Sequence, residues 1–263
     1  MIFDCGQKLL IIIFINIEIV ELKILNTYQE LSSKVAEQVI QLMSGYDEPL
    51  LCPASGDTPA GLYKVLVEKY QQRKIDVSNW SFAGLDEWVG LNGNDEGSCR
   101  YSIDRELFLP LNISVDRISF FDGRAADLFS ECEYAEQFIN RHKGIDVTIL
   151  GLGMNGHIAM NEPGCAVDSR AQIVELHPMT RQVGQKYFNQ PQALKDGITL
   201  GLGTLLESRH IILIVSGKKK AGIVKKMLEE PPTNELPGSL LLNHSSITVF
   251  LDADAACLLS NRE

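Results

Sequence analysis

Two segments of this 263-residue sequence carry side chains suited to proton transfer. Asn155, His157 and Glu162 fall within one short stretch after an apolar run, and Asp86 directly follows another such run. Histidine is the natural proton carrier near neutral pH, and a nearby carboxylate fixes its tautomer and raises its pKa. We therefore interpret His157 with Glu162 as an acid–base pair and Asp86 as a general base. The structural alternatives are a loop histidine that caps the backbone and a solvated acidic pair, Asp86 and Glu87.

Two further segments have the composition of anion-binding helix starts. Ser55, Gly56, Asp57 and Thr58 open a predicted helix, where free backbone N–H groups and the positive end of the helix dipole attract anions. A run of three lysines ending at Lys220 opens another, where the dipole disfavours cations unless an anion lies among them. Together the segments indicate a phosphate site, provided that the Asp57 side chain points away from it. The alternatives are an ordinary helix start capped by Thr58 and a solvated lysine run.

The pattern Gly151-x-Gly153-x-x-Gly156 follows a predicted strand and matches the dinucleotide-binding fingerprint. That fingerprint needs a helix after the third glycine, because the helix N-terminus receives the pyrophosphate. Here Asn161 and Pro163 interrupt the segment soon after the third glycine. We therefore expect no nicotinamide or flavin cofactor.

Apolar, β-branched runs alternate along the chain with stretches of helical spacing. Runs such as Val147–Leu150 and Ile211–Val215 are almost continuously apolar, which is typical of parallel strands covered by helices on both faces. Such sheets bind ligands at the carboxyl ends of their strands, where the four polar segments fall. The fold class predicted is α/β with a mostly parallel sheet. Strands are predicted at Ile19–Leu25, Pro49–Cys52, Trp80–Leu85, Ile118–Phe121, Val147–Leu150, Gln172–Leu176, Gly197–Leu200, Ile211–Val215 and Ile247–Leu251, and helices at Tyr28–Met43, Pro59–Gln71, Cys99–Phe108, Ala125–Arg141, Lys218–Leu228 and Ala253–Leu259.

The N-terminal segment Leu9–Val20 is apolar except for Asn16 and Glu18. It is shorter and more polar than the roughly 20 apolar residues that a membrane-spanning helix needs. It also lacks the small-residue cleavage site that ends a signal peptide. We predict an N-terminal extension over residues 1–18, a single α/β domain over residues 19–263, no membrane partner and a cytoplasmic location.

The chain has 24 Lys and Arg against 34 Asp and Glu, a net charge of −10. This balance argues against a nucleic-acid partner, because no excess of positive charge is present to neutralise phosphates. It is compatible with a small anion, since a few local cations override a distant negative surface. The six cysteines are scattered without zinc-binding spacing, so we expect reduced thiols and no metal.

Three motifs resemble those of the glucosamine-6-phosphate deaminase (isomerase) family. They are residues 55–63 (SGDTPAGLY), 85–90 (LDEWVG) and 156–164 (GHIAMNEPG). The similarity runs from about Glu21 to Leu259, and the GHIxxNEP element is specific, whereas the related 6-phosphogluconolactonases carry a GHxAS-type loop. The resemblance implies a three-layer, modified Rossmann-like α/β sandwich with no metal or organic cofactor. It also implies that an amino-sugar 6-phosphate and water are converted to a ketose 6-phosphate and ammonia.

The resemblance implies a role for each candidate catalytic residue. Asp86 would move a proton between C2 and C1 through a cis-enolamine. His157 would act as acid and base at the ring oxygen during pyranose opening, and Glu162 would orient it and tune its charge. Asn155 stands where some members have a third carboxylate.

The 6-phosphate would be held by Ser55–Thr58 together with Lys220 and Lys186. Lys186 stands where the family usually has an arginine, so the charge is kept but the bidentate fork is lost. Asp57 replaces a usual small residue and Trp88 a usual tyrosine, changes that could retune the pocket toward galactosamine 6-phosphate.

Allosteric members of the family bind an N-acetyl amino-sugar phosphate through hydroxyl and basic residues. The corresponding segments here, Cys165–Ala166 and Gln172–Val174, lack them. We therefore predict no activation by such an effector.

Three functions are compatible with these residues. The first is an amino-sugar 6-phosphate deaminase/isomerase, acting on glucosamine or galactosamine 6-phosphate. The second is a 6-phosphogluconolactonase-type hydrolase, and the third a non-catalytic sugar-phosphate sensor. A sugar phosphate is the expected partner in each case. Family members occur as monomers and as hexamers, so a homo-oligomer is one of two expected states.

Overall fold

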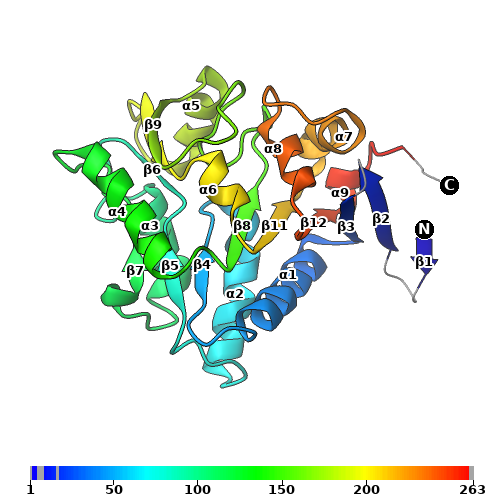
Figure 1. Ribbon diagram of the computed structural model, residues 1–263, viewed down its shortest axis with the longest axis horizontal. Coiled ribbons are helices and arrows are strands. Elements are labelled where there is room, and N and C mark those ends of the chain that lie inside the picture. The colour runs from blue at the N-terminus through cyan, green and yellow to red at the C-terminus, as the bar shows by residue number, and fades with distance from the viewer. Residues whose placement is uncertain (1, 5–8, 16–17, 261–263) are drawn as a thin grey trace.

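A parallel sheet runs through the molecule with helices on both of its faces (Figure 1). The computed structural model describes the backbone of residues 2–4, 9–15 and 18–260. Within these residues, seven parallel strands have the order β3-β12-β11-β8-β4-β5-β7. The predicted α/β class is confirmed. The strands are β3 Glu18–Leu25, β4 Leu50–Cys52, β5 Ser81–Ala83, β7 Ile118–Ser119, β8 Val147–Gly151, β11 His210–Val215 and β12 Ile247–Asp252.

The two faces of this sheet bury separate apolar cores. Side chains alternate along a strand, so Ile211 and Leu213 enter one core while Ile212 and Ile214 enter the other. The first core is covered by α4, α6, α7 and α8, and the second by α1, α2 and the α3–η1 segment. Double coverage is why the central strands are apolar at most positions. The helices are α1 Tyr28–Met43, α2 Asp57–Gln71, α3 Cys99–Ile103, η1 Asp104–Phe108, η2 Val115–Arg117, α4 Leu128–Arg141, α5 Pro178–Gly184, η3 Gln185–Tyr187, α6 Leu202–Leu206, η4 Lys218–Lys220, α7 Ala221–Glu229, α8 Pro237–Leu240, η5 Leu241–Asn243 and α9 Ala253–Ala256.

A small antiparallel sheet stands beside α5 at one end of the molecule (Figure 1). Its order is β6-β10-β9, with β6 at Asp86–Trp88, β9 at Gln172–Glu175 and β10 at Asp196–Thr199. The single strand predicted over Trp80–Leu85 is therefore wrong at its end. The main-sheet strand β5 stops at Ala83, and a new strand begins at Asp86.

The start of α2 also corrects a prediction. The helix begins at Asp57 rather than Pro59, and its N-cap is Gly56 (φ +98°), with no side-chain cap hydrogen bond. Thr58 is therefore inside the helix and not its cap. Glycine adopts this backbone conformation without a side-chain clash. Because the cap offers no side-chain acceptor, the first amides of α2 remain available to a ligand.

Two N-terminal strands extend the main sheet beyond β3. They are β1 Ile2–Asp4 and β2 Leu9–Ile15, and β2 pairs antiparallel with β3. The division into an extension over residues 1–18 and a domain over residues 19–263 stays a prediction. Among the described residues, no helix has the length and apolar character to cross a membrane.

Candidate active site

The four polar segments meet because the strands that precede them are neighbours. The sheet order β11-β8-β4-β5 brings the chain after Val215, Gly151, Cys52 and Ala83 to one carboxyl edge. This is the edge at which parallel sheets bind their ligands.

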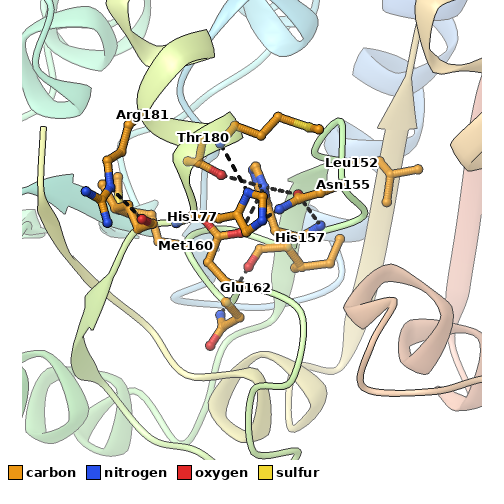
Figure 2. Close-up of polar contacts among 12 residues, drawn as sticks. Leu152, Asn155, His157, Met160, Glu162, His177, Thr180 and Arg181 are labelled. Atoms are coloured by element: carbon orange, nitrogen blue, oxygen red, sulfur yellow. Dashed lines mark hydrogen bonds and ion pairs between the residues drawn. The ribbon is translucent and has the colours of Figure 1, made fainter.

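His157 lies at the centre of a hydrogen-bonded group in the loop after β8 (Figure 2). Its Nδ1 is 2.6 Å from the Asn155 side-chain oxygen, and the Asn155 amide donates to Glu162 Oε2 at 2.8 Å. The same carboxylate oxygen is 3.6 Å from His157 Nδ1. Since an amide oxygen only accepts, Nδ1 carries the proton and Nε2 has the free lone pair. The arrangement fixes one tautomer of the ring.

Gly153 makes room for this ring. A Cβ on Gly153 would lie 2.3 Å from His157 Nδ1, well inside van der Waals contact. The Gly153 N–H donates to the His157 carbonyl at 2.9 Å, so the loop folds back on itself. The glycine pattern that resembles a dinucleotide fingerprint therefore serves the close approach of the histidine ring to the backbone.

The α5 region closes the other side of the histidine. The Thr180 hydroxyl lies 3.3 Å from His157 Nδ1, and the His177 N–H donates to Glu162 Oε1 at 3.1 Å. Arg181 points away from the ring in Figure 2 and instead donates to the Leu176 carbonyl at 2.6 Å. Thr180 and His177 were not predicted from the sequence, because they come from a segment without a motif.

The histidine is neutral at pH 7. Burial lowers the pKa of His157 to about 4, Glu162 opposes this shift, and the charges of Lys220 and His177 add to it. The side chain keeps 21% exposure, so the ring is reachable from outside. It can act first as a proton acceptor, through Nε2.

Asp86 is the first residue of β6 and is 7% exposed. Burial raises the pKa of Asp86 to about 6, and a hydrogen bond from the Cys99 thiol works in the opposite direction. A carboxylate with this pKa is mostly ionised at pH 7 and is close enough to that pH to exchange a proton readily.

Glu87, next in sequence, has a different role. It is fully buried and accepts the backbone N–H groups of Trp88, Cys99 and Arg100, each at 2.9 Å. Burial raises the pKa of Glu87 to about 7. Its carboxylate binds the first N–H groups of α3 and so holds this helix against β6. Because both carboxylates are buried, the alternative of a solvated acidic pair is wrong.

The predicted phosphate loop is in contact with Lys186. Lys186 Nζ donates to Asp57 at 2.6 Å, which turns that carboxylate toward η3. Although partial burial opposes it, this hydrogen bond raises the pKa of Lys186. The Tyr187 hydroxyl covers Gly56, since a Cβ there would be 2.8 Å from it.

Lys220 contacts the loop of the histidine group and lies near enough to Lys186 to be affected by its charge. Its ammonium donates to the Leu152 carbonyl, in the loop that carries His157. Burial lowers the pKa of Lys220 to about 8, and the nearby charge of Lys186 lowers it further. The same Lys220 charge depresses the pKa of His157. Two cations that repel each other beside uncapped helix amides are a site that an anion would stabilise.

Cys99 is a further residue that sequence reasoning missed. Its side chain is buried, burial raises the pKa of its thiol, and the charges of Asp86 and Glu87 raise that pKa further. The sequence predicted Cys99 only as the first residue of a helix, which gave no signal that it lies near Asp86 and Glu87.

Among the described residues, no group of three or more His, Cys, Asp or Glu side chains has the arrangement of a metal site. The titratable groups of the edge are instead paired with amides, hydroxyls and lysines.

Fold and site together define a class: a layered α/β protein with buried acid–base groups and lysines at the carboxyl edge of its sheet. The family model described as glucosamine-6-phosphate isomerases/6-phosphogluconolactonase matches residues 26–250. The chain belongs to this family, and the resemblance noted from its motifs is confirmed.

Relatives of known structure or curated sequence extend over most of the chain. A glucosamine-6-phosphate deaminase of Geobacillus sp. (strain WCH70) is 36% identical over 237 residues, which are 90% of this chain and 94% of that protein. Glucosamine-6-phosphate deaminase 1 of Bacillus subtilis (strain 168) is 35% identical over 233 residues, 88% and 96% of the two chains. The solved structure of a monomeric glucosamine-6-phosphate deaminase has a TM-score of 0.87 at 34% identity, covering 90% of this chain and 99% of that one. The 6-phosphogluconolactonase from Trypanosoma cruzi shares the fold, with a TM-score of 0.74 at 20% identity over 91% and 96% of the chains.

Proposed function

We propose that this protein is a glucosamine-6-phosphate deaminase, which converts glucosamine 6-phosphate and water to a ketose 6-phosphate and ammonia. The observation that carries the proposal is the neutral, oriented His157 on the same sheet edge as Asp86, whose pKa is raised to about 6. The curated relatives at about 35% identity support it.

The substrate phosphate binds at the N-terminus of α2, between Lys186 and Lys220. The uncapped amides after Gly56 and the two ammonium groups supply donors for a dianion. Lys186 leaves Asp57, or shares its protons between Asp57 and the phosphate, when the anion enters.

Ring opening is assigned to His157. Its Nε2 takes the proton of the C1 hydroxyl and returns it to the ring oxygen as the C1–O5 bond breaks. Asn155 keeps the proton on Nδ1, and Glu162, in contact with Asn155 and His157, stabilises the imidazolium that forms between the two transfers.

The isomerisation is assigned to Asp86. Its carboxylate removes the C2 proton of the open-chain amino aldehyde, and the former carbonyl oxygen at C1 takes up a proton, which gives a cis-enolamine. Delivery of a proton to C1 then leaves an iminium at C2. Water adds to this iminium, and the adduct loses a proton and expels ammonia to give the ketone at C2. Desolvation of Asp86 strengthens it as a base for this step.

Galactosamine 6-phosphate is the second substrate to be tested. Trp88 packs against Phe188 at a ring-centroid distance of 6.4 Å, and Asp57 pairs with Lys186. Asp57 thus contacts η3 itself and Trp88 contacts the residue that follows it, and we propose that both act on the sugar through the position of this segment. This favours glucosamine 6-phosphate as the better substrate.

The proposal includes the remaining expectations from the sequence. The catalytic domain begins near residue 19, and the enzyme works in the cytoplasm, where the free Cys52, Cys99 and Cys132 stay reduced. A homo-oligomer is not required, since a solved relative is described as monomeric.

A coupled ammonia assay with glucosamine 6-phosphate and galactosamine 6-phosphate in parallel tests the function. We expect ammonia from the first at a kcat/KM at least tenfold above the second. A lactonase would instead hydrolyse 6-phosphogluconolactone without releasing ammonia, and a sensor would bind both sugars and turn over none. Absence of ammonia from both amino sugars overturns the proposal.

A further inference from the structure

The predicted phosphate loop carries a negative charge of its own. Asp57 is the first residue of α2, and its Oδ2 lies 2.6 Å from the ammonium nitrogen of Lys186. The two residues are 129 positions apart in the sequence, so the fold brings them together. Lys186 is one of the two lysines proposed to hold the substrate phosphate. Its ammonium is thus already engaged by a carboxylate of the same chain.

The Asp57 carboxylate also belongs to the helix end at which the phosphate is proposed to bind. An acidic side chain in the first turn of a helix interacts favourably with the positive end of the helix dipole, and Asp57 has this position in α2. The helix end and the Lys186 ammonium are two of the features from which the phosphate site was inferred. The carboxylate therefore uses the same partners as the anion.

Both side chains of this ion pair are open to solvent. The Asp57 side chain is 75% exposed and that of Lys186 is 47% exposed. Exposed ion pairs are weak, and a doubly charged phosphate attracts an ammonium more strongly than a carboxylate does. An entering phosphate can therefore open the contact, but the free energy of opening is subtracted from the free energy of phosphate binding.

The loop backbone and the lysine each have a support that does not involve the Asp57 carboxylate. The Tyr28 hydroxyl of α1 donates to the Asp57 carbonyl at 3.0 Å and accepts the Gly61 N–H at 2.8 Å. The Lys186 ammonium lies over the Tyr187 ring, 4.7 Å from its centroid, a cation–π contact. A change of the Asp57 side chain should therefore leave the helix amides and the ammonium in place.

We propose that Asp57 is an internal competitor of the substrate phosphate: its carboxylate holds Lys186 in the free enzyme and releases it when the phosphate binds. The role rests on the proposed deaminase function, which supplies the phosphate. A tethered carboxylate has a high effective concentration at the lysine, so an anion replaces it only by binding more strongly than a carboxylate does. Asp57 touches no reacting atom, so it sets the affinity for the substrate and not the rate of proton transfer.

Asp57→Asn tests the competition, because asparagine keeps the shape of the side chain and removes its charge. The Kd of inorganic phosphate, measured by calorimetry at pH 8, should fall about threefold to tenfold, and the KM for glucosamine 6-phosphate should fall with it. The change in kcat should stay below about twofold. The gain in affinity should shrink in about 0.5 M sodium chloride, because salt screens exposed charges. An unchanged or higher Kd would mean that Asp57 positions Lys186 for the phosphate, and it overturns the proposal.

Lys186→Met separates competition from general repulsion between Asp57 and the phosphate. Without the ammonium there is no shared partner, so adding Asp57→Asn to Lys186→Met should change the KM by less than about twofold. A gain as large as in the wild-type background would mean that the carboxylate only repels the phosphate, and the proposed competition would be wrong.

Glu37→Gln is the matched control. Glu37 is an exposed carboxylate paired with a lysine, Lys34, and it lies on α1, which carries no predicted site residue. The variant removes the same charge and should keep the wild-type Kd and KM, and thermal unfolding should show every variant folded. A gain equal to that of Asp57→Asn would attribute the effect to net charge and defeat the proposal.

The two proposals fail in different ways. If the wild type releases no ammonia while Asp57→Asn binds inorganic phosphate more tightly, the deaminase function is wrong and the role of Asp57 at an anion site stands. Release of ammonia by the wild type, with an unchanged Kd in Asp57→Asn, defeats the Asp57 role alone.

Discussion

Burial moves the pKa values of the two candidate proton carriers in opposite directions and leaves both as bases at neutral pH. It disfavours the imidazolium of His157 and lowers its pKa to about 4, whereas it disfavours the carboxylate of Asp86 and raises its pKa to about 6. Asn155 occupies Nδ1, so the histidine has a single site at which to take up a proton. In the proposed mechanism the histidine is therefore a weak, directional proton carrier for oxygen, and the aspartate is a stronger one for carbon. Separated proton affinities of this kind are typical of sites that perform two different transfers.

Asp86→Asn tests the assignment of the base. An amide cannot accept the C2 proton, so kcat should fall by about 10³-fold or more, within the range expected for a lost general base. In the wild type, kcat/KM should fall tenfold per pH unit well below pH 6, because the carboxylate becomes protonated there. Steady-state rates between pH 5 and 9 measure both. Binding of inorganic phosphate, followed by calorimetry, should change by less than about twofold, and near-normal turnover in the variant would show that Asp86 is not the base.

The same variant has a stability signature that separates lost chemistry from lost folding. The folded protein binds the Asp86 proton more tightly than the unfolded chain, since burial raises this pKa from 3.8 to about 6. The contribution of Asp86 to the free energy of unfolding of the wild type is therefore fully present below pH 4, and it is lost as the pH rises through 6. Asparagine does not titrate, so the variant should be more stable than the wild type at pH 8, by about 3 kcal/mol at most. The difference should shrink toward pH 4. A variant less stable at pH 8, measured by urea unfolding, would mean that burial does not strain the carboxylate.

At the scale of elements, long periodic segments were predictable and short ones were not. The helix over Tyr28–Met43 is observed with the predicted bounds, because its buried residues recur at helical spacing over four turns. α5, α6 and α8 have seven, five and four residues, too few for a periodicity to develop, and they form because neighbouring elements support them. Thr180 was missed with α5 for that reason.

The site was predictable where a motif follows a strand, and it was not where distant segments meet. Asp86 and Glu87 read alike in the sequence, yet alternation along β6 turns them to opposite sides. The partner of Glu87 is the N-terminus of α3, which begins twelve residues later at Cys99. Likewise, the sequence around Lys186 does not indicate that this residue pairs with Asp57, which lies 129 residues away.

Gly153→Ala tests the loop after β8 as an element built around the histidine ring. The added Cβ would lie 2.3 Å from His157 Nδ1, so the ring must leave Asn155 or the loop must shift. We expect kcat/KM to fall by about 10²-fold, since small displacements of catalytic groups cost rates of that order. Steady-state kinetics measure the loss, and the melting temperature should drop by only a few degrees.

Gly222→Ala is the control for a glycine-to-alanine change. Gly222 is exposed in α7 with open space around the position of a Cβ, so alanine should keep full activity and stabilise the protein by up to about 1 kcal/mol. Equal activity of the Gly153 and Gly222 variants would show that the ring does not depend on the space at Gly153.

At the scale of the whole molecule, the net charge of −10 coexists with a local cationic site. Burial and the nearby charge of Lys186 lower the pKa of Lys220, and a bound anion would relieve the repulsion between the two cations. The surplus of acid elsewhere argues against a polyanion as a ligand, but not against a single phosphate group. The net charge of the protein therefore argues against a ligand with many negative charges, and it is compatible with a ligand that carries one phosphate group.

Regulation is the last property that belongs to the molecule as a whole. The segments that would have to bind an effector are engaged internally: the Cys165 N–H donates to the Glu162 carbonyl at 3.0 Å, and the Gln172 amide donates to Asn161 at 3.3 Å. Asn161 is fully buried and also ties the Ile158 and Leu200 carbonyls together. Neither segment offers a cation for a second phosphate.

We therefore expect no activation by N-acetylglucosamine 6-phosphate, the N-acetylated form of the proposed substrate. Initial rates against glucosamine 6-phosphate should follow a hyperbola, with a Hill coefficient near 1, both without the effector and with it at millimolar concentration.

At high concentration the compound should only compete with the substrate, because it carries the same phosphate into the Lys186–Lys220 site. KM should then rise while kcat stays constant. Light scattering at the assay concentration would show whether one or several copies are responding. A rise in rate, or a sigmoidal curve that the effector straightens, would reveal a second phosphate site coupled to Glu162, since linkage requires distinct sites with different affinities in two states.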